Sequence, residues 1–420
     1  MPAGVLFVHN NFPAQFRHLA EALVARGVPC RAIGMATAPG LQGVRIGRYD
    51  LPRGSTPDIA PLATRAEADL IRARMALESA RAFKVEGFEP AVIVGHPGWG
   101  ETVLLDNAFP NAKQVLFAEF FYHGRGLDIG FDTEFGRLTD LAVLQGKAKN
   151  AIGALALTDA DAIVAPTRFQ ASVLPPVFHP RVRIIHEGVD VDAIRPGPAE
   201  PFVLDDGRVI APGTPVITHV NNQMEALRGL HIFARALPRL LAEVPDAQVL
   251  IWGQEQTRGY GGEAPDGKTW KQVIFEPLEG RLDLSRIHFL GRTPHERMLA
   301  GLRLSTAHVY YTYPFVLSWS LSEAMASGCY VIGSDTAPVR DAIKDGVNGR
   351  LLSFFDVDAL SAAMIQACRD PAASVAMRAA ARETAVAMFN RNKGLAAWLA
   401  LLAEMGLEIP GNSQPDRFEF

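Results

Sequence analysis

The segment from Tyr313 to Gly328 has the residue types of an anion-binding turn. It follows an apolar run at 308–311 and continues into small and apolar residues that predict a helix. Backbone N–H groups near Ser318 to Ser320 would point out of the start of that helix, where the helix dipole favours anions such as phosphate. Glu323 comes one turn in, where its carboxylate could accept hydrogen bonds from two vicinal hydroxyl groups, as a ribose presents them. The alternative is that Glu323 only caps the helix or pairs locally.

Polar side chains also follow two predicted strands in the first half of the chain. Asn10 and Asn11 come after the apolar run 5–8, and His96 comes after the run 91–95. Active sites in open α/β sheets lie beyond such strand ends, so the asparagines could bind hydroxyls or phosphate and His96 could bind a ligand there. Trp99 offers an apolar face on which a ligand ring could stack. The alternatives are an ordinary turn for the asparagines and a core position for His96.

Two further loops follow predicted strand ends. The aromatic and polar loop 119–126 suits the wall of an acceptor site, or equally a packed loop; its candidate residues are Glu119, Tyr122 and His123. The loop with Tyr260 and Lys268 follows the strand 248–251 and could meet the base of a nucleotide.

Short apolar runs alternate with helical patterns along the whole chain. This alternation predicts an α/β fold with parallel sheets covered on both faces by helices. The expected strands lie at 5–8, 31–35, 91–94, 114–118, 162–165, 182–185, 216–220, 248–251, 287–290, 307–311 and 330–334. Helices are expected at 64–85 and 229–244, and from Pro13 to a stop at Gly27, and the segment 371–406 reads as helix without strand.

The length of the chain favours two domains. At 420 residues it is too long for one ordinary core. Five prolines and three glycines between Arg195 and Pro215 predict a linker there. Two doubly wound halves of similar size flank that stretch.

Composition excludes several classes of protein. The 41 basic and 45 acidic residues give a net charge of −4, which leaves no basic field for nucleic acid. Three cysteines, Cys30, Cys329 and Cys368, cannot form a disulfide framework and indicate a reduced, cytoplasmic protein. No secretory signal or membrane-spanning run is expected. The glycines of a dinucleotide-binding turn and the common zinc motifs are missing, so no cofactor or metal is expected.

The late part of the chain resembles a known family. The strand Tyr330–Ser334 leads into Asp335–Ile343 and then Asp345–Leu352, and the likeness runs unbroken from about Ile287. This order resembles the retaining GT-B glycosyltransferases of family 4, also called glycosyl transferases group 1. Shorter family-like pieces occur at 159–169 and 186–190. The resemblance implies two Rossmann-like domains facing a cleft: an acceptor-side domain at 1–194, a linker at 195–215, a nucleotide-sugar domain at 216–385, and a C-terminal helix at 386–420 that returns to the first domain.

The resemblance implies roles for the residues around Glu323. Glu323 takes the second Glu position of the family's E-x7-E pattern, which binds the ribose. The first Glu position falls on Phe315, which supplies no charge and accepts no strong hydrogen bond. Backbone amides in this stretch could still hold sugar and phosphate; the donor-binding residues are then Phe315, Val316, Leu317, Ser318, Trp319, Ser320 and Glu323.

The family also grips the diphosphate with an Arg and a Lys six residues apart. Arg228 takes the Lys position and keeps a cation, whereas the Arg position holds Asn222. Arg292, just after the strand 287–290, could compensate for the lost cation. His96 stands where the family places a polar residue near the donor sugar or the acceptor. The catalytic candidates are therefore His96, Asn222 and Arg228; the alternative for Arg228 is a solvated charge at a helix start.

The expected activity is retaining transfer of a sugar from a nucleotide diphosphate sugar to a hydroxyl acceptor. The acceptor could be a glycan, a lipid-linked glycan or a small molecule, and a lipid-linked acceptor would bring peripheral contact with a membrane. A catalytically weak nucleotide-sugar-binding protein is the alternative, because two charged family positions are replaced. A sugar-nucleotide epimerase is a weaker rival, because it needs acid and base carboxylates around the sugar. The sequence leaves the donor, the acceptor and the oligomeric state open.

Overall fold

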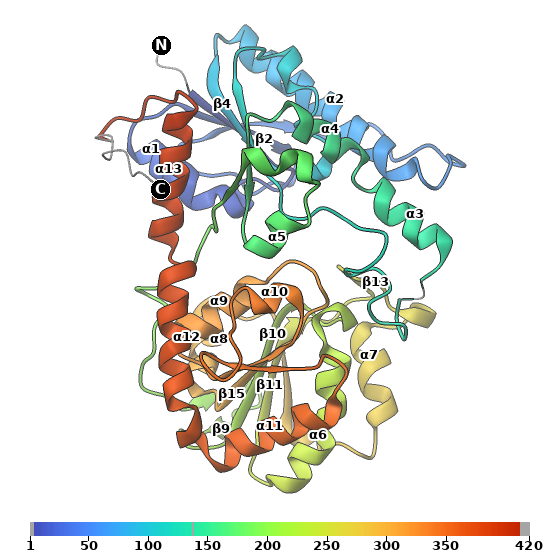
Figure 1. The fold of residues 1–420 in the computed structure, drawn as a ribbon, viewed down its shortest axis with the longest axis vertical. Helices are drawn as coiled ribbons and strands as arrows, with labels where there is room; N and C mark the ends of the chain where they lie inside the picture. The colour runs from blue at the N-terminus through green and yellow to red at the C-terminus, as the bar shows by residue number, and fades with distance from the viewer. Residues whose placement is uncertain (1–3, 137, 412–420) are drawn as a thin grey trace. The chain divides into compact units, whose positions relative to one another are not determined.

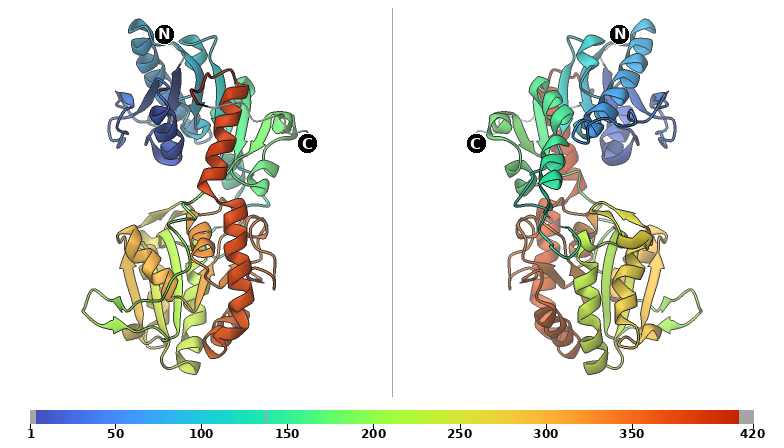
Figure 2. Two further views of the ribbon diagram at one scale, coloured as in Figure 1. Left: turned by 90° about the vertical axis from the view of Figure 1, so that its left-hand side faces the viewer. Right: turned by 90° about the vertical axis from the view of Figure 1, so that its right-hand side faces the viewer.

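The computed structural model describes residues 4–136 and 138–411, which divide into two compact units (Figure 1). Within the described residues, unit 1 holds 4–125, 138–187 and 392–411. Unit 2 holds 126–136 and 188–391. Each unit is built around its own parallel sheet, with helices packed on it (Figures 1 and 2).

Unit 1 contains a seven-stranded parallel sheet with the order β3-β2-β1-β4-β5-β6-β7. The chain runs from β1 outward to β3, then returns to the other side of β1 and continues from β4 to β7. The direction of the chain therefore reverses between β1 and β4, and their carboxyl ends flank that point. The strands are β1 (Gly4–Val8), β2 (Cys30–Met35), β3 (Arg45–Tyr49), β4 (Pro90–Gly95), β5 (Lys113–Phe117), β6 (Ala162–Ala165) and β7 (Val182–Ile184).

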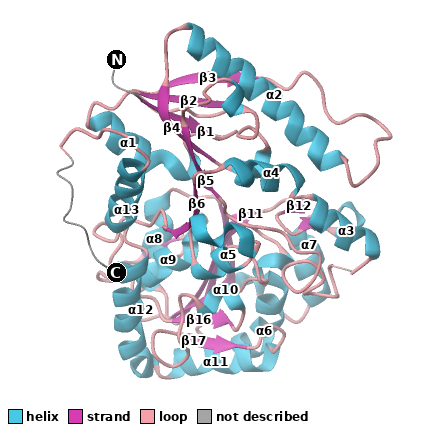
Figure 3. Ribbon diagram, turned by 45° about the horizontal axis from the view of Figure 1, so that its top comes forward, coloured by secondary structure: helices cyan, strands magenta, loops and turns pink. Residues whose placement is uncertain are grey.

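Unit 2 repeats this plan with six parallel strands in the order β14-β11-β10-β15-β16-β17. Here the chain direction reverses between β10 and β15. The strands of the sheet are β10 (Val216–Gln223), β11 (Gln248–Gln254), β14 (Ile287–Gly291), β15 (Ala307–Tyr310), β16 (Val331–Ser334) and β17 (Arg350–Leu352). Of these, β11, β16 and β17 are labelled in Figure 3, where strands are magenta. Two short hairpins lie outside the sheet, β8 (Phe202–Val203) with β9 (Val209–Ile210) and β12 (Arg258–Gly259) with β13 (Gly262–Glu263).

Helices cover both faces of each sheet, and the pleat of β1 shows why this strand is apolar throughout. Val5 and Phe7 lie in one buried cluster and Leu6 and Val8 in another, because successive side chains point to opposite faces. The helices of unit 1 are α1 (Arg17–Ala25), α2 (Thr64–Val85), α3 (Asp140–Ala148), α4 (Ala151–Asp159), α5 (Arg168–Ser172) and α13 (Arg391–Glu404). Those of unit 2 are α6 (Leu230–Glu243), α7 (Trp270–Phe275), α8 (His295–Leu304), α9 (Trp319–Ala326), α10 (Ala337–Arg340), α11 (Val357–Arg369) and α12 (Val375–Met388).

The predicted fold class, two Rossmann-like α/β domains, is confirmed. Every strand expected from the sequence is present within a residue or a few of its predicted ends, and α2 has its predicted bounds. β3 and β17, each the outermost strand at one edge of its sheet, were not predicted from the sequence. β3 is mostly polar and only its last residue is buried, so it lacks the apolar run that marks the other strands.

The boundaries between the two units lie at other residues than the predicted domain boundaries. The stretch 195–215 lies inside unit 2, because Phe202, Leu204 and Ile210 are buried in that unit's core. Apart from the excursion after residue 125, the chain passes between the units at 187–188 and at 391–392. The short segment 126–136, expected in the first domain, belongs to unit 2.

The last helix packs in unit 1, as the family resemblance implies. In α13, Trp398 and Leu402 share a buried cluster with Phe16 and Phe117. The ring of Trp398 stacks on that of Phe117, with centroids 6.4 Å apart. Cys30 and Cys329 are buried and Cys368 is partly buried, each as a free thiol. None of the helices described for this chain has the length and apolar character that crossing a bilayer requires.

Candidate functional site

The polar residues of unit 2 gather where the chain direction reverses, at the carboxyl ends of β10 and β15. Arg228 follows β10 on a single 3-10 turn (Ala226–Arg228). The loop from Thr312 to Ser318 follows β15 and leads into α9. This is the position at which open α/β sheets bind ligands.

Arg228 ties these two loops together. Its side chain is buried, and its Nη1 donates hydrogen bonds to Thr312 Oγ1 at 3.0 Å and to the carbonyl of Val316 at 2.8 Å. The guanidinium carbon also lies 5.8 Å from the centre of the Phe315 ring, a cation–π distance. No other acceptor for this guanidinium is present among the described residues, so Nε and Nη2 remain available to a ligand. Arg228 is thus a positioned cation and not a solvated one.

The loop before α9 presents free amides, but not at all the residues predicted. The amide of Ser318 donates to the hydroxyl of Tyr310 at 2.8 Å, and that of Ser320 donates to Ser318 Oγ at 3.3 Å. The prediction that these two amides face an anion is therefore wrong, because the loop satisfies them internally. The amides of Val316 and Leu317 have no protein acceptor in the part of the chain that the structure describes. The available donors lie just ahead of the helix.

The large side chains in this loop and at the start of α9 differ in exposure. Phe315 is buried, whereas Trp319, at the start of α9, is about half exposed (48%). Glu323, one turn further, is largely buried and accepts a hydrogen bond from His295 Nε2 at 2.6 Å. This bond raises the pKa of His295 above its usual value, against the opposing effect of burial.

The other predicted residues of unit 2 lie around the end of β10 and the end of β14. Asn222 is exposed, and its side-chain amide donates to the hydroxyl of Tyr260 at 3.4 Å. Arg292 is exposed, with no side-chain hydrogen bond to the described residues. Lys268 instead pairs with Glu276, 2.5 Å away.

Glu225, three residues before Arg228, was missed by the sequence analysis. Its side chain is buried; Oε2 accepts from the amide of Gly261 at 2.8 Å, and Oε1 has no partner among the described residues. Burial raises the pKa of Glu225, while the Gly261 amide and Arg228 act in the opposite direction. It holds the hairpin that carries Tyr260, and no local motif in the sequence marks it.

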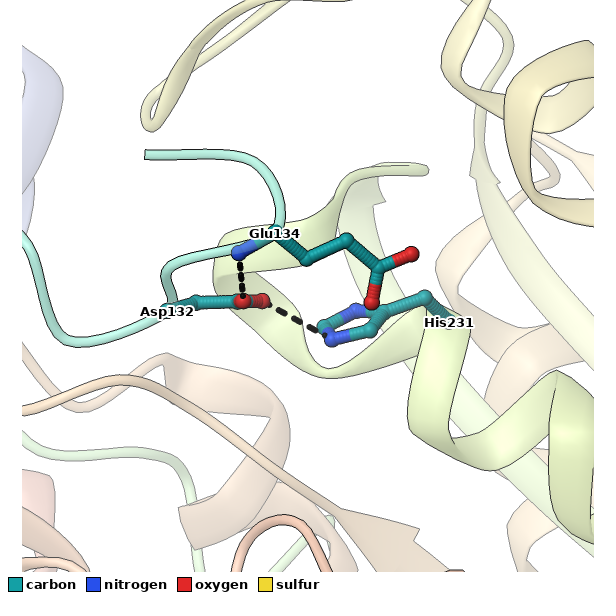
Figure 4. Close-up of side chains that lie close together, drawn as sticks. All are labelled: Asp132, Glu134 and His231. Carbon is teal, nitrogen blue, oxygen red and sulfur yellow. Dashed lines mark hydrogen bonds and ion pairs between the residues drawn. The ribbon is translucent and has the colours of Figure 1, made fainter. Parts of the chain in front are cut away.

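Asp132, Glu134 and His231 bring three side chains with metal-binding groups close together (Figure 4). Asp132 Oδ2 lies 3.0 Å from His231 Nε2 and accepts from the hydroxyl of Tyr313 at 2.6 Å. Glu134 forms two hydrogen bonds with Arg235. Because the Tyr313 hydroxyl already binds Asp132 and the Arg235 guanidinium already binds Glu134, we interpret this cluster as a clasp that fixes the segment 126–136 to unit 2. Phe131 adds to it by packing 5.2 Å from the ring of Tyr313.

In unit 1 two histidines lie at the point where the chain direction reverses. His9 follows β1 and His96 follows β4, and their ring centres are 5.6 Å apart. Each Nδ1 accepts a backbone amide, from Asn11 at 2.9 Å and from Gly98 at 3.1 Å, which places the proton of the neutral ring on Nε2. Burial, with a contribution from His96, lowers the pKa of His9 to about 3. His96 Nε2 lies 3.6 Å from Glu119 Oε2, at the end of the next strand.

The structure brings only some of the predicted unit 1 residues to this point. Asn10 and Asn11 lie beside His9, with side-chain amides that bind no described protein group. Trp99 is 6.3 Å from His96 between ring centres, and Arg65 lies 5.2 Å above the Trp99 ring, which occupies one face.

Two residues of the predicted acceptor wall are used to build their loop. The backbone of Tyr122 forms two hydrogen bonds with the side chain of Asn150, and Lys149 covers its ring at 4.7 Å. His123 Nε2 lies 2.8 Å from the carbonyl of Val173. These contacts favour the packed-loop interpretation for both residues.

Comparison with known proteins identifies the family. A family described as glycosyl transferase family 4 group matches residues 26–194, and the family described as glycosyl transferases group 1 matches residues 207–384. Together the two matches span most of both units. The chain belongs to the group 1 glycosyltransferases of family 4.

Similar proteins agree with this assignment. A D-inositol 3-phosphate glycosyltransferase of Nocardia farcinica is 27% identical over 249 residues, which cover 57% of this chain and 52% of that protein. The chain therefore spans about half the length of this curated relative. The sucrose-phosphate synthase structure from Thermosynechococcus elongatus has a TM-score of 0.71 at 17% identity, covering 96% of this chain and 99% of the other. Anabaena HepE in complex with UDP-glucose has a TM-score of 0.63 at 14% identity, covering 96% and 99%. At these identities the structures show the shared GT-B fold.

The two positions at which the sequence is predicted to depart from the family pattern lie beside Arg228 and Tyr260. Phe315, predicted to take the first acidic position of the E-x7-E pattern, lies against Arg228. Asn222, predicted to take the position of a diphosphate-binding Arg, contacts Tyr260. The candidate site of this group 1 member therefore holds one buried cation, two amides without an acceptor among the described residues, and one carboxylate.

Proposed function

We propose that this protein is a retaining glycosyltransferase that moves a sugar from a nucleoside diphosphate sugar to a hydroxyl group. The observation that carries the proposal is Arg228, which is buried at the end of β10 and bound to Thr312 and Val316, while two of its guanidinium nitrogens bind no described residue. A diphosphate that binds these nitrogens would also meet the amides of Val316 and Leu317.

The chemistry follows from where charge develops. As the bond between the sugar and the diphosphate breaks, negative charge grows on the leaving phosphate oxygen. Donors fixed in advance of the reaction stabilise that charge without reorganising, and Arg228 with the loop amides is such a set. The mechanism proposed from the family is front-face. The acceptor hydroxyl attacks the anomeric carbon on the side of the leaving group, and its proton passes to the leaving phosphate oxygen. This reaction needs no bound metal or cofactor.

The proposed donor and acceptor rest on the chemistry of both units and on the relatives. Glu323 supports recognition of a ribose, and UDP-glucose, the ligand of Anabaena HepE, is the first donor to test. The relative from Nocardia farcinica is named for D-inositol 3-phosphate, which supports a polyol hydroxyl as the acceptor. Asn10, Asn11, His96 and Glu119 offer the amide, imidazole and carboxylate groups that bind hydroxyls.

A donor screen tests the proposal. The full chain is incubated with UDP-, GDP- and ADP-sugars, and thermal unfolding is followed. Sugar nucleotides with one of the three bases are expected to raise the midpoint temperature of unfolding. The chain is also expected to hydrolyse the stabilising sugar nucleotide slowly when no acceptor is present. A chain that none of the nucleotides stabilises and that hydrolyses none of them would contradict the proposed function.

A second candidate is a nucleotide-sugar-binding protein with little transferase activity. Phe315 favours it, because an aromatic ring lies against Arg228 where the family has a carboxylate near the donor sugar. Calorimetry separates the two candidates. Tight binding of a nucleoside diphosphate with no turnover of the matching sugar nucleotide would support the binding protein.

A further inference from the structure

Glu323 is held by a residue that the family pattern does not include. Its side chain projects from α9 and is only 14% exposed. His295 Nε2 lies 2.6 Å from Glu323 Oε1. Among the described residues no donor binds Oε2, so one carboxylate oxygen is fixed by the protein and the other is open.

His295 reaches Glu323 from a different part of the sheet. It is the first residue of α8, which follows β14, and it comes 28 residues before Glu323. Its ring is 55% exposed, and this is the only side-chain hydrogen bond of His295 among the described residues. The raised pKa of His295 agrees with a bond in which the ring carries positive charge next to the carboxylate.

A carboxylate that is already oriented suits a ribose better than a mobile one. Glu is among the side chains that lose most rotamer freedom when they are fixed, and a charge-assisted hydrogen bond removes that freedom before the ligand arrives. An ionised carboxylate has about four acceptor sites, so the bond from His295 leaves enough for two vicinal hydroxyls.

We propose that His295 is a positioning residue for nucleotide recognition, which fixes the Glu323 carboxylate so that it accepts hydrogen bonds from the ribose hydroxyls of the donor. This inference rests on the proposed function, because it requires that a nucleotide binds in unit 2. In this proposal His295 acts on the ligand only through Glu323. Its effect is therefore confined to ligands that carry the hydroxyls.

Ligands with and without these hydroxyls provide the test. Binding of UDP, GDP and ADP to the full chain is measured by calorimetry, together with the 2′,3′-dideoxy form of the diphosphate that binds best. The wild-type protein is expected to prefer the ribose form by roughly tenfold or more, the loss expected for hydrogen bonds to a charged group. H295A is expected to remove most of this preference, while the affinity for the dideoxy form stays within about twofold of wild type.

Three further variants distinguish positioning from a general structural effect. H295Q can still donate from its side-chain amide to Glu323 and is expected to restore part of the preference. E323A removes the preference, and H295A/E323A is expected to bind like E323A alone, because His295 acts through Glu323. E296A changes the exposed neighbour of His295 and is expected to leave the preference unchanged.

The outcomes separate the inference from the proposed function. If H295A keeps the wild-type preference, or weakens both ligand forms equally, His295 does not position Glu323. If the wild-type protein binds a nucleoside diphosphate but does not distinguish the two forms, this inference fails while the proposed function stands. If none of the three diphosphates binds, both fail.

Discussion

The guanidinium of Arg228 donates a 2.8 Å hydrogen bond to the backbone carbonyl of Val316. The bond links the loop after β10 to the loop after β15, and the amide of Tyr313 strengthens the link by donating to the carbonyl of Leu227 at 2.9 Å. Val316, whose carbonyl accepts this bond, has a backbone amide with no acceptor among the described residues. The same side chain therefore supplies a cation and fixes the amides that would act with it.

Replacing Arg228 should affect turnover more than donor binding. R228A removes the cation that we propose binds the leaving diphosphate, and it breaks the bond to Val316. We therefore expect a loss of about 2–4 kcal/mol of transition-state stabilisation, as for an oxyanion donor. R228K keeps the charge but loses the fixed fork, and it is expected to be only partly active. Steady-state kcat and KM with the donor found in the screen measure both effects.

The matched control is R281A, which removes an exposed arginine that makes no side-chain hydrogen bond among the described residues. It should have wild-type kinetics. An unchanged turnover number in R228A would remove Arg228 from the reaction.

Gly229 fixes the direction in which α6 leaves this loop. Its φ is +69°, and a Cβ at this position would lie 2.3 Å from the Cβ of Tyr311. G229A therefore combines a left-handed backbone with a clash against a buried strand end, and it should destabilise unit 2 by roughly 1–3 kcal/mol. The urea midpoint measures this. G207A, at a left-handed glycine with open space around it, controls for the backbone conformation alone.

Most strands of the two sheets could be predicted from the sequence, but few of the hydrogen bonds between residues far apart in the chain could be. The buried strand β1 could be predicted because its residues are apolar, whereas the edge strand β3 lacks such a run. Arg228 and Glu323 were singled out because one follows a predicted strand and the other lies in the first turns of a predicted helix. The bonds of Glu323 to His295 and of Tyr313 to Asp132 join residues 28 and 181 positions apart, so no local spacing reveals them. Ser318 and Ser320 were misjudged for a related reason, since the acceptors that satisfy their amides are visible only in the folded loop.

The clasp of Asp132 predicts a pH-dependent contribution to stability. Burial alone would raise the pKa of Asp132, but hydrogen bonds from His231, Tyr313 and the Glu134 amide lower it to about 2. A lowered pKa means that the stabilisation is present above the ordinary value near 4 and is lost as the pH falls toward 2. D132N should therefore lower the free energy of unfolding at pH 7 by about 1–3 kcal/mol, which is measured as a lower urea midpoint.

The difference in urea midpoint between D132N and wild type should become smaller below pH 4, because the wild-type carboxyl of Asp132 then takes up a proton. D246N, at an exposed aspartate without a hydrogen bond among the described residues, should match wild type at every pH. Equal midpoints for D132N and wild type at pH 7 would show that the clasp does not stabilise unit 2.

His96 should matter for sugar transfer but not for nucleotide binding. Its Nδ1 accepts the Gly98 amide, so Nε2–H is the group left to donate to a sugar hydroxyl. The ring lies where the chain direction reverses in the sheet of unit 1, next to His9. H96A is expected to lower kcat/KM by roughly tenfold or more, the loss of one fixed donor in the transition state. Calorimetry should give a wild-type Kd for the nucleoside diphosphate, because Arg228 and Glu323 are untouched. H96Q keeps a side-chain N–H and should recover part of the rate, whereas H18A, on the outer surface of α1, should resemble wild type. If H96A weakens nucleotide binding as much as transfer and also lowers the thermal midpoint, His96 is a packing residue and the reaction must use another donor of unit 1.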